Sequence, residues 1–209
     1  MTANSAFFDK YFPQRIQRAL VKCIFENYKE SSRYCFRHFG APQAKDLSGV
    51  YRRARIEDEF AGISALYKEL TVTALTYQNN TGYYNEISCG EIKLTQSCIS
   101  DKNEVPRQAL YRSTLASAGQ LDLFESSDDG TSRYLYAILT HGVDLNSPKR
   151  NWPAFISVQF PNAECTAYLD DGIDLMARFP EIVAEYIPKL QFGAGATVTK
   201  RRRKKEEGA

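Results

Sequence analysis

The chain has 209 residues, of which 43% are hydrophobic and 25% are charged. These values are ordinary for a folded globular protein, and they exclude a disordered tail, a collagen-like rod and a small disulfide scaffold. The formal net charge is +2, but residues 200–207 hold six cations and two glutamates, a net +4, which leaves −2 on the rest of the chain. The bulk charge therefore does not predict nucleic-acid binding, which would depend on local patches and on the C-terminus.

The cysteines and the absence of targeting signals indicate the compartment. The five cysteines are odd in number and form no CxxC pair, which is typical of reduced thiols, so we expect a cytoplasmic protein. The N-terminus lacks the charged and apolar regions of a signal peptide. No stretch approaches the ~18 apolar residues that a membrane span needs, and we expect no membrane contact.

The N-terminal third predicts two helices. Over residues 13–30, apolar residues recur every four positions from Ile16 to Tyr28, which indicates an amphipathic helix. Residues 31–50 contain two glycines and a proline, so we expect an irregular segment there. A second helix is predicted over residues 51–69, again from the spacing of its apolar residues.

The rest of the chain predicts strands with two more helices. Strands are expected where β-branched and aromatic residues gather between turn signals. They lie at 70–77, 83–99 with a break at Gly90, 133–140 and 154–160. Helices are expected at 106–118 and 181–190, whereas 173–179 fits either a strand or a helix.

This order of elements predicts the fold class and the domain organisation. Helices before, between and after the strands are typical of an α+β domain, with helices packed on a mixed sheet of about five strands. We expect a single domain over residues 1–192. Residues 193–209 begin with Gly-Ala-Gly-Ala and continue into the basic run, and so predict a flexible basic tail.

Glu91 and Lys93 form the most informative short pattern. Residues two apart on a strand share a face, so the carboxylate could hold Mg²⁺ while the ammonium orients an attacking water or steadies phosphoryl charge. The pair resembles the E-x-K part of the PD-(D/E)XK nucleases, and the order of elements over 51–118 resembles that family too. The resemblance implies a Mg²⁺-dependent nuclease with catalytic Glu91 and Lys93.

The resemblance leaves the second metal-binding carboxylate open. That family takes an Asp from the preceding strand or turn, but this sequence has no Asp between Asp58 and Asp101. Glu86 would have to replace it, or Asp58 would have to reach the ion from the helix. The alternative for the Glu91 and Lys93 pattern is a solvated strand face with a cross-strand ion pair.

His141 is the third catalytic candidate. It follows the apolar strand at 133–140, and loops at strand ends carry much of catalysis. Histidine titrates near neutral pH and suits general acid–base work. The alternative is a simple turn at Gly142. No glycine-rich phosphate loop of the GxxxxGK[ST] or GxGxxG type occurs, so we expect no nucleotide cofactor.

Two basic clusters are candidates for phosphate contacts. The first opens the helix predicted at 51–69 and consists of Arg52, Arg53 and Arg55. The second is the tail, whose cations are Lys200, Arg201, Arg202, Arg203, Lys204 and Lys205. Each phosphate that such cations neutralise adds salt-sensitive affinity without sequence preference. The alternative for the tail is a disordered, solubilising end.

These observations give two hypotheses for function. The first is an intracellular protein that acts on or near nucleic acid, in its sharpest form a Mg²⁺-dependent nuclease. The second is a non-catalytic interaction protein, such as a regulatory or immunity-type partner of another protein. The first is the leading hypothesis, whereas the many aromatic residues and the lack of any complete catalytic motif support the second as its alternative.

Overall fold

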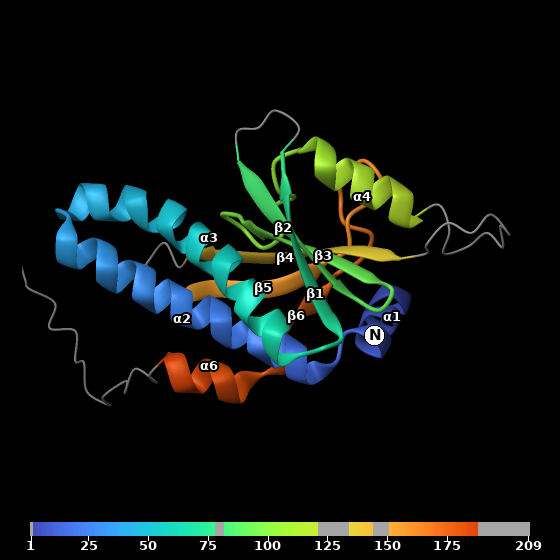
Figure 1. Ribbon diagram of the computed structural model, residues 1–209, viewed down its shortest axis with the longest axis horizontal. Helices are drawn as coiled ribbons and strands as arrows, with labels where there is room; N and C mark the ends of the chain where they lie inside the picture. The colour runs from blue at the N-terminus through green and yellow to red at the C-terminus, as the bar shows by residue number, and fades with distance from the viewer. Residues whose placement is uncertain (1, 78–81, 121–133, 144–150, 188–209) are drawn as a thin grey trace, which may run out of the picture.

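The computed structural model describes residues 2–77, 82–120, 134–143 and 151–187. Within these residues the fold is α+β, as the sequence predicts (Figure 1). The helices are α1 Ala3–Tyr11, α2 Gln14–His38, α3 Ala41–Leu66, α4 Leu110–Gln120, α5 Leu175–Arg178 and α6 Pro180–Tyr186. The strands are β1 Leu70–Thr76, β2 Tyr83–Cys89, β3 Ile92–Cys98, β4 Leu135–Val143, β5 Pro153–Gln159 and β6 Ile173–Asp174.

The strands form one mixed sheet in the order β1-β2-β3-β4-β5-β6. Neighbouring strands are antiparallel except for β3 and β4, which are parallel. Parallel neighbours need a crossover connection, and α4 lies in the connection between them. The two-residue strand β6 is an edge of the sheet and lies in the stretch 173–179, for which the sequence left strand and helix open.

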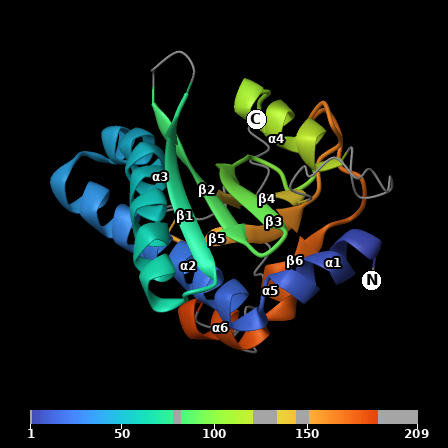
Figure 2. The same cartoon turned by 45° about the vertical axis from the view of Figure 1, so that its right-hand side comes forward.

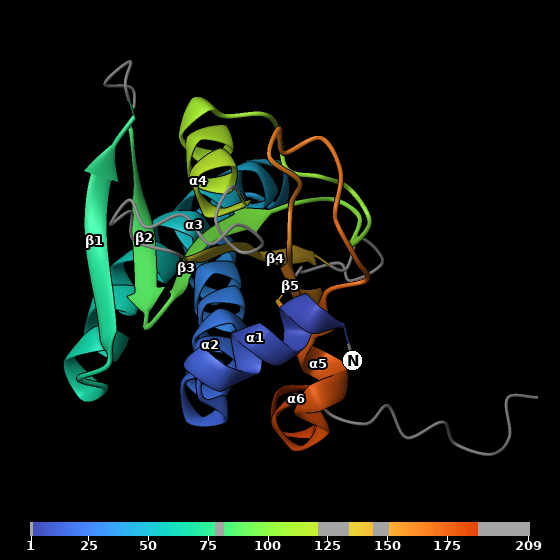
Figure 3. The same cartoon turned by 90° about the vertical axis from the view of Figure 1, so that its right-hand side faces the viewer.

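Helices cover both faces of the sheet. The long helices α2 and α3 pack against each other as a hairpin on one face, whereas α4 packs on β4 from the other (Figures 1 and 3). The alternation of β4 explains this arrangement, because successive side chains point to opposite faces. Ala137 and Leu139 join the larger core cluster, whereas Tyr136 and Ile138 join the smaller cluster beneath α4.

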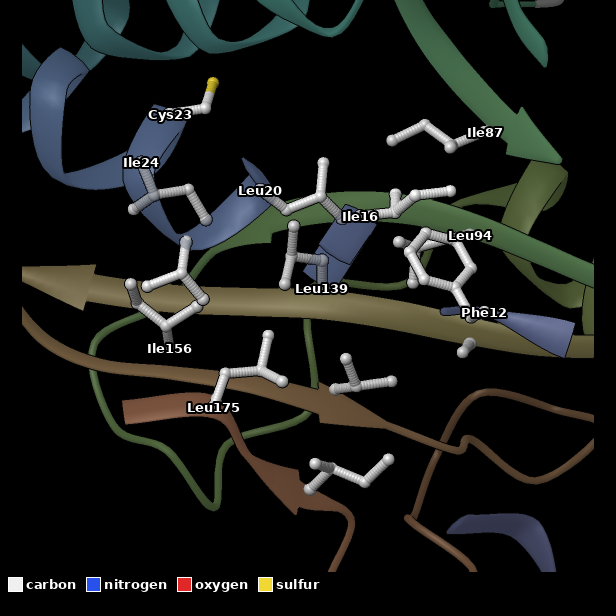
Figure 4. Packing of buried hydrophobic residues seen from close by; sticks show 14 of the residues in the cluster. Phe12, Ile16, Leu20, Cys23, Ile24, Ile87, Leu94, Leu139, Ile156 and Leu175 are labelled. Carbon is white, nitrogen blue, oxygen red and sulfur yellow. The ribbon is translucent and has the colours of Figure 1, made fainter. Parts of the chain in front are cut away.

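The larger core forms where α2 meets the sheet. Ile16, Leu20 and Ile24 follow one another at helical spacing, and each is at most 1% exposed. Figure 4 shows these side chains meeting residues of the sheet, among them Leu139 and Ile156. The predicted apolar stripe is therefore the surface that binds α2 to the sheet.

The prediction of an irregular segment at 31–50 is wrong. α2 continues to His38, and α3 begins at Ala41, so only two residues separate the helices. Pro42 lies in the first turn of α3, where its missing N–H is no loss. Gly49 lies on the exposed side of α3, where a glycine weakens a helix without ending it.

Several other boundaries differ from the predictions. α1 was not predicted, and α4 begins at Leu110 rather than at residue 106. The predicted break at Gly90 is confirmed, because β2 and β3 lie on either side of this residue, and its φ of +54° suits a glycine. Residues 173–179 contain both alternatives, β6 and then α5. The predicted tail, 193–209, lies outside the described residues. None of the described helices is long and apolar enough to cross a membrane.

Candidate functional site

Glu91 does not lie on a strand. It occupies the turn between β2 and β3, where it is exposed, and its carbonyl oxygen accepts a hydrogen bond from the Leu135 N–H at 2.7 Å. The prediction that Glu91 and Lys93 share a strand face is therefore wrong at Glu91, because the strand begins one residue later.

The other predicted metal ligands do not gather around Glu91. Glu86 on β2 forms an ion pair of 3.0 Å with Lys93 on β3, as in the cross-strand alternative, and the Lys93 ammonium lies 4.6 Å from the ring centroid of Tyr134. Asp58 is exposed on α3. Within the described parts of the chain, no three His, Cys, Asp or Glu residues are placed to hold a metal ion. The Mg²⁺ site stays a prediction that this geometry does not support.

His141 is not in a loop. β4 continues to Val143, so His141 lies within the strand and is only 1% exposed. Burial, with a smaller contribution from the charge of Arg52, lowers the pKa of His141 to about 3. The imidazole is therefore neutral at physiological pH and does not reach solvent, which gives no support to an acid–base role.

His141 belongs to a buried hydrogen-bonded chain of four side chains. Gln96 Nε2 donates to Glu57 Oε1 at 2.8 Å, which directs the Gln96 carbonyl oxygen at His141 Nε2, 2.9 Å away. Because a carbonyl only accepts, His141 carries its proton on Nε2 and accepts at Nδ1 from the Tyr28 hydroxyl at 2.9 Å. The four groups thus satisfy one another without a metal ion or a ligand.

Glu57 is the last member of this hydrogen-bonded chain and contacts Asn85 of β2. Its Oε2 accepts from the Asn85 backbone N–H at 3.0 Å, and its own carbonyl oxygen accepts from Asn85 Nδ2 at 2.6 Å. Burial raises the pKa of Glu57, against the opposing effects of the hydrogen bonds from Gln96 and Asn85 and the charges of Arg53 and Arg112. No local pattern identifies Glu57 as part of this chain of hydrogen bonds, because its partners are 28 and 39 residues away in the sequence.

The three arginines of the first basic cluster have different environments. Arg52 is 2% exposed, with its guanidinium carbon 3.9 Å from the ring centroid of Tyr28, so it cannot reach a ligand at the surface. Arg55 forms an ion pair with Glu59 one turn further along α3. Arg53 alone of the three is exposed at a groove. The six cations of the predicted tail lie outside the described residues.

This groove has a volume of about 790 Å³, within the range of ligand sites in proteins. Residues from α3, from β1 and β2, and from α4 with the segment before it surround it. Figure 2 shows α4 facing the β1–β2 hairpin. The described lining residues are Arg53, Thr76, Tyr77, Tyr84, Arg107, Gln108, Ala109, Leu110, Tyr111, Arg112, Thr114 and Leu115. They include three arginines and no acidic residue.

Three tyrosines of the groove stack on one another. The ring centroids of Tyr84 and Tyr111 are 3.9 Å apart, and the centroid of Tyr77 lies 5.7 Å and 5.5 Å from them, respectively. Burial raises the pKa of Tyr111 to about 12, so this phenol stays protonated and uncharged at neutral pH. The stack joins the hairpin to α4 and provides an aromatic wall.

The protein itself positions two of the groove arginines. Arg53 Nη2 donates to the Tyr83 carbonyl at 3.0 Å and to the Tyr77 hydroxyl. Arg112 Nη1 donates to the Arg107 carbonyl at 2.8 Å, and Nη2 donates to Ser97 Oγ at 3.3 Å. Each guanidinium has five N–H donors, so donors are left for an anionic ligand.

The residues that line the groove are far apart in the sequence, and no local pattern connects them. Its arginines and tyrosines come from three separate regions of the chain, and of its lining only Arg53 was a candidate from the sequence. The charges of Arg53 and Arg112 reach the buried Glu57, so the groove and the polar chain are electrostatic neighbours. Comparison of the chain with protein-family models, with curated proteins and with solved structures finds no match.

Proposed function

We propose that this protein binds nucleic acid without cleaving it, and that it holds a single-stranded segment in the arginine–tyrosine groove. The observation that carries the proposal is the combination of three arginines, three stacked tyrosines and no acidic residue among the described lining of one groove. Arginines contact phosphates, and aromatic rings stack with bases, so the lining offers both kinds of contact.

The aromatic wall favours a single strand over a duplex. Bases in a duplex are stacked on each other and do not present their faces, whereas an unpaired base can stack against a tyrosine ring face that the mutual stacking of the three rings leaves open. Arg53 and Arg112 are already positioned by hydrogen bonds, which lowers the entropic cost of fixing them on a ligand. The tail of Lys200–Lys205 would add phosphate contacts without sequence preference.

The exposed position of Glu91 supports the non-catalytic form of the proposal. Its carboxylate lies in a turn, away from the groove lining, and the described lining supplies no carboxylate for a cation. We expect no cleavage of RNA or plasmid DNA by the wild type in the presence of Mg²⁺ or Mn²⁺. Cleavage that disappears in Glu91→Ala would instead favour the nuclease prediction.

Removal of the groove arginines tests the binding site. We expect Arg53→Ala with Arg107→Ala to weaken binding of a fluorescent single-stranded oligonucleotide and to reduce the slope of log K against log salt by about 1.4, at ~0.7 per phosphate. The control is Arg33→Ala, which removes an exposed arginine that pairs with Glu30 on α2, outside the groove lining.

Three further outcomes of the same titrations are decisive. Wild-type affinity that is equal for single and double strands would contradict a role for the tyrosines. Binding that survives the double arginine change but disappears when residues 200–205 are deleted would assign nucleic-acid binding to the tail alone. Binding of inorganic phosphate or a mononucleotide, but of no oligonucleotide, would make the groove a small-anion site.

A further inference from the structure

The outer edge of β1 is suited to pair with another strand. β1 is an end strand of the sheet, and only β2 pairs with it among the described residues (Figure 3). The opposite end, β6, has only two residues. β1 has seven, with the sequence Leu-Thr-Val-Thr-Ala-Leu-Thr.

The backbone groups that face outward can be identified from the register. The Tyr77 N–H donates to the Gly82 carbonyl at 2.9 Å, which continues the β1–β2 pairing by one residue. Because backbone groups alternate between the two sides of a strand, those of Val72, Ala74 and Thr76 point away from β2. No hydrogen bond within the described residues reaches these outward groups.

The edge lacks the features that usually prevent strands from associating. Exposed edges are commonly protected by charged residues, proline or a bulge, but β1 contains neither a charge nor a proline, and its register with β2 is regular. Ala74 and Thr73 are exposed. Such an edge is a template for β-strand addition.

We propose that β1 pairs antiparallel with β1 of a second copy of this chain, with Ala74 opposite Ala74 at a two-fold axis. This register uses all the outward N–H and C=O groups of Val72, Ala74 and Thr76. An uncharged strand meets itself without like-charge repulsion, and a two-fold pair is closed, so it leaves no free β1 edge.

Exposed apolar side chains beside the edge also favour a second copy. Leu66, at the end of α3 that leads into β1, is 77% exposed, and Tyr83, at the other end of the β1–β2 pair, is 49% exposed. An antiparallel pair brings the Leu66 end of one copy towards the Tyr83 end of the other, so both apolar side chains would lie near the contact between the two copies.

A charge-swap experiment on the full chain tests this proposal. We expect the wild type to have twice the mass of one chain in light scattering, and Ala74→Lys to be a monomer because two lysines would face each other across the axis. Ala74→Glu alone should also be monomeric, whereas an equimolar mixture of the two variants should recover the dimer. The control Ala61→Lys makes the same change at an exposed position of α3 and should remain dimeric.

Two results would contradict the proposed dimer. A wild type that is monomeric over a wide range of concentration overturns the proposal. A dimer that persists in Ala74→Lys places the contact elsewhere. Circular dichroism of each variant checks that the change has left the fold intact. Because no nucleic acid is added, failure here does not affect the proposed groove.

Discussion

The imidazole of His141 is held neutral by its surroundings. It lies between the Tyr28 hydroxyl and the Gln96 amide, 1% exposed, with the guanidinium of Arg52 near enough to disfavour a second positive charge. A buried group with this donor and acceptor pattern fixes the position of β4 relative to α2 and β3 through hydrogen bonds. Loss of one partner would leave a buried polar atom unsatisfied.

The lowered pKa of His141 predicts a loss of stability in acid. The folded protein takes up this proton only near pH 3, whereas the unfolded chain takes it up near the ordinary histidine pKa of 6.5. Stability from this residue is therefore complete above pH 6.5 and falls by up to about 1.4 kcal/mol per pH unit as the pH decreases towards 3. Urea unfolding at several pH values should show this fall in the wild type and a shallower one in His141→Gln.

His38→Gln is the control for this pH profile. It removes the other histidine of the chain, at the exposed end of α2, and leaves His141 in place, so the steep fall should remain. The raised pKa of Glu57 acts in the opposite direction, since stability is lost as the pH rises from the ordinary pKa of a glutamate to the higher pKa of the folded state. Glu57 is present in both His38→Gln and His141→Gln, so the difference between the stability–pH profiles of these two variants isolates the contribution of His141. Equal profiles for the wild type and His141→Gln would contradict the argument.

At the scale of elements, local spacing predicted helices and strands where one face is apolar, and it failed where contacts are long-range. The stripe from Ile16 to Tyr28 identified α2 because 3.6-residue spacing is visible in the sequence. Its extension to His38 was missed because α3 stabilises that part, and a partner helix leaves no local signal. The groove was missed for the same reason. Arg53 was proposed as a phosphate contact, but its tyrosine neighbours come from the end of the β1 segment at Tyr77, just after the strand, and from β2 and α4.

Two glycines should respond oppositely to alanine. Gly49 is exposed within α3, and an added Cβ would meet nothing within 4 Å, so Gly49→Ala should raise the free energy of unfolding by about 0.5–1 kcal/mol. At Gly142 in β4, a Cβ would lie 2.5 Å from the Ile99 carbonyl oxygen and from the Phe155 ring, so Gly142→Ala should lower stability. Urea titrations of both variants measure the two effects. Stabilisation by Gly142→Ala would contradict the close approach.

For the whole molecule, the proposed dimer would arrange the two grooves on one surface. An antiparallel pair within a continuous sheet has its axis perpendicular to the sheet, so the same face is presented by both copies. Each groove includes the end of β1 at Thr76 and Tyr77. In the proposed register Thr76 of one copy lies opposite Val72 of the other, so the two Thr76 residues would be about four residues apart along the strands, ~13 Å at ~3.3 Å per residue. One extended strand of nucleic acid could then contact both grooves.

The unequal packing on the two sides of the sheet has a consequence for motion. α2 belongs to the large cluster, whereas α4 rests on a small one that contains Leu115, Ala116 and three residues from β4 and the segment after β5. Elements with little buried apolar contact open at a lower free energy than the rest of a protein. Backbone amides of α4 should therefore exchange with deuterium sooner than those of α2, and an oligonucleotide seated against Tyr111 should slow exchange in α4 while leaving α2 unchanged. The α4 wall of the groove would thus be mobile in the free protein and become fixed when the ligand binds.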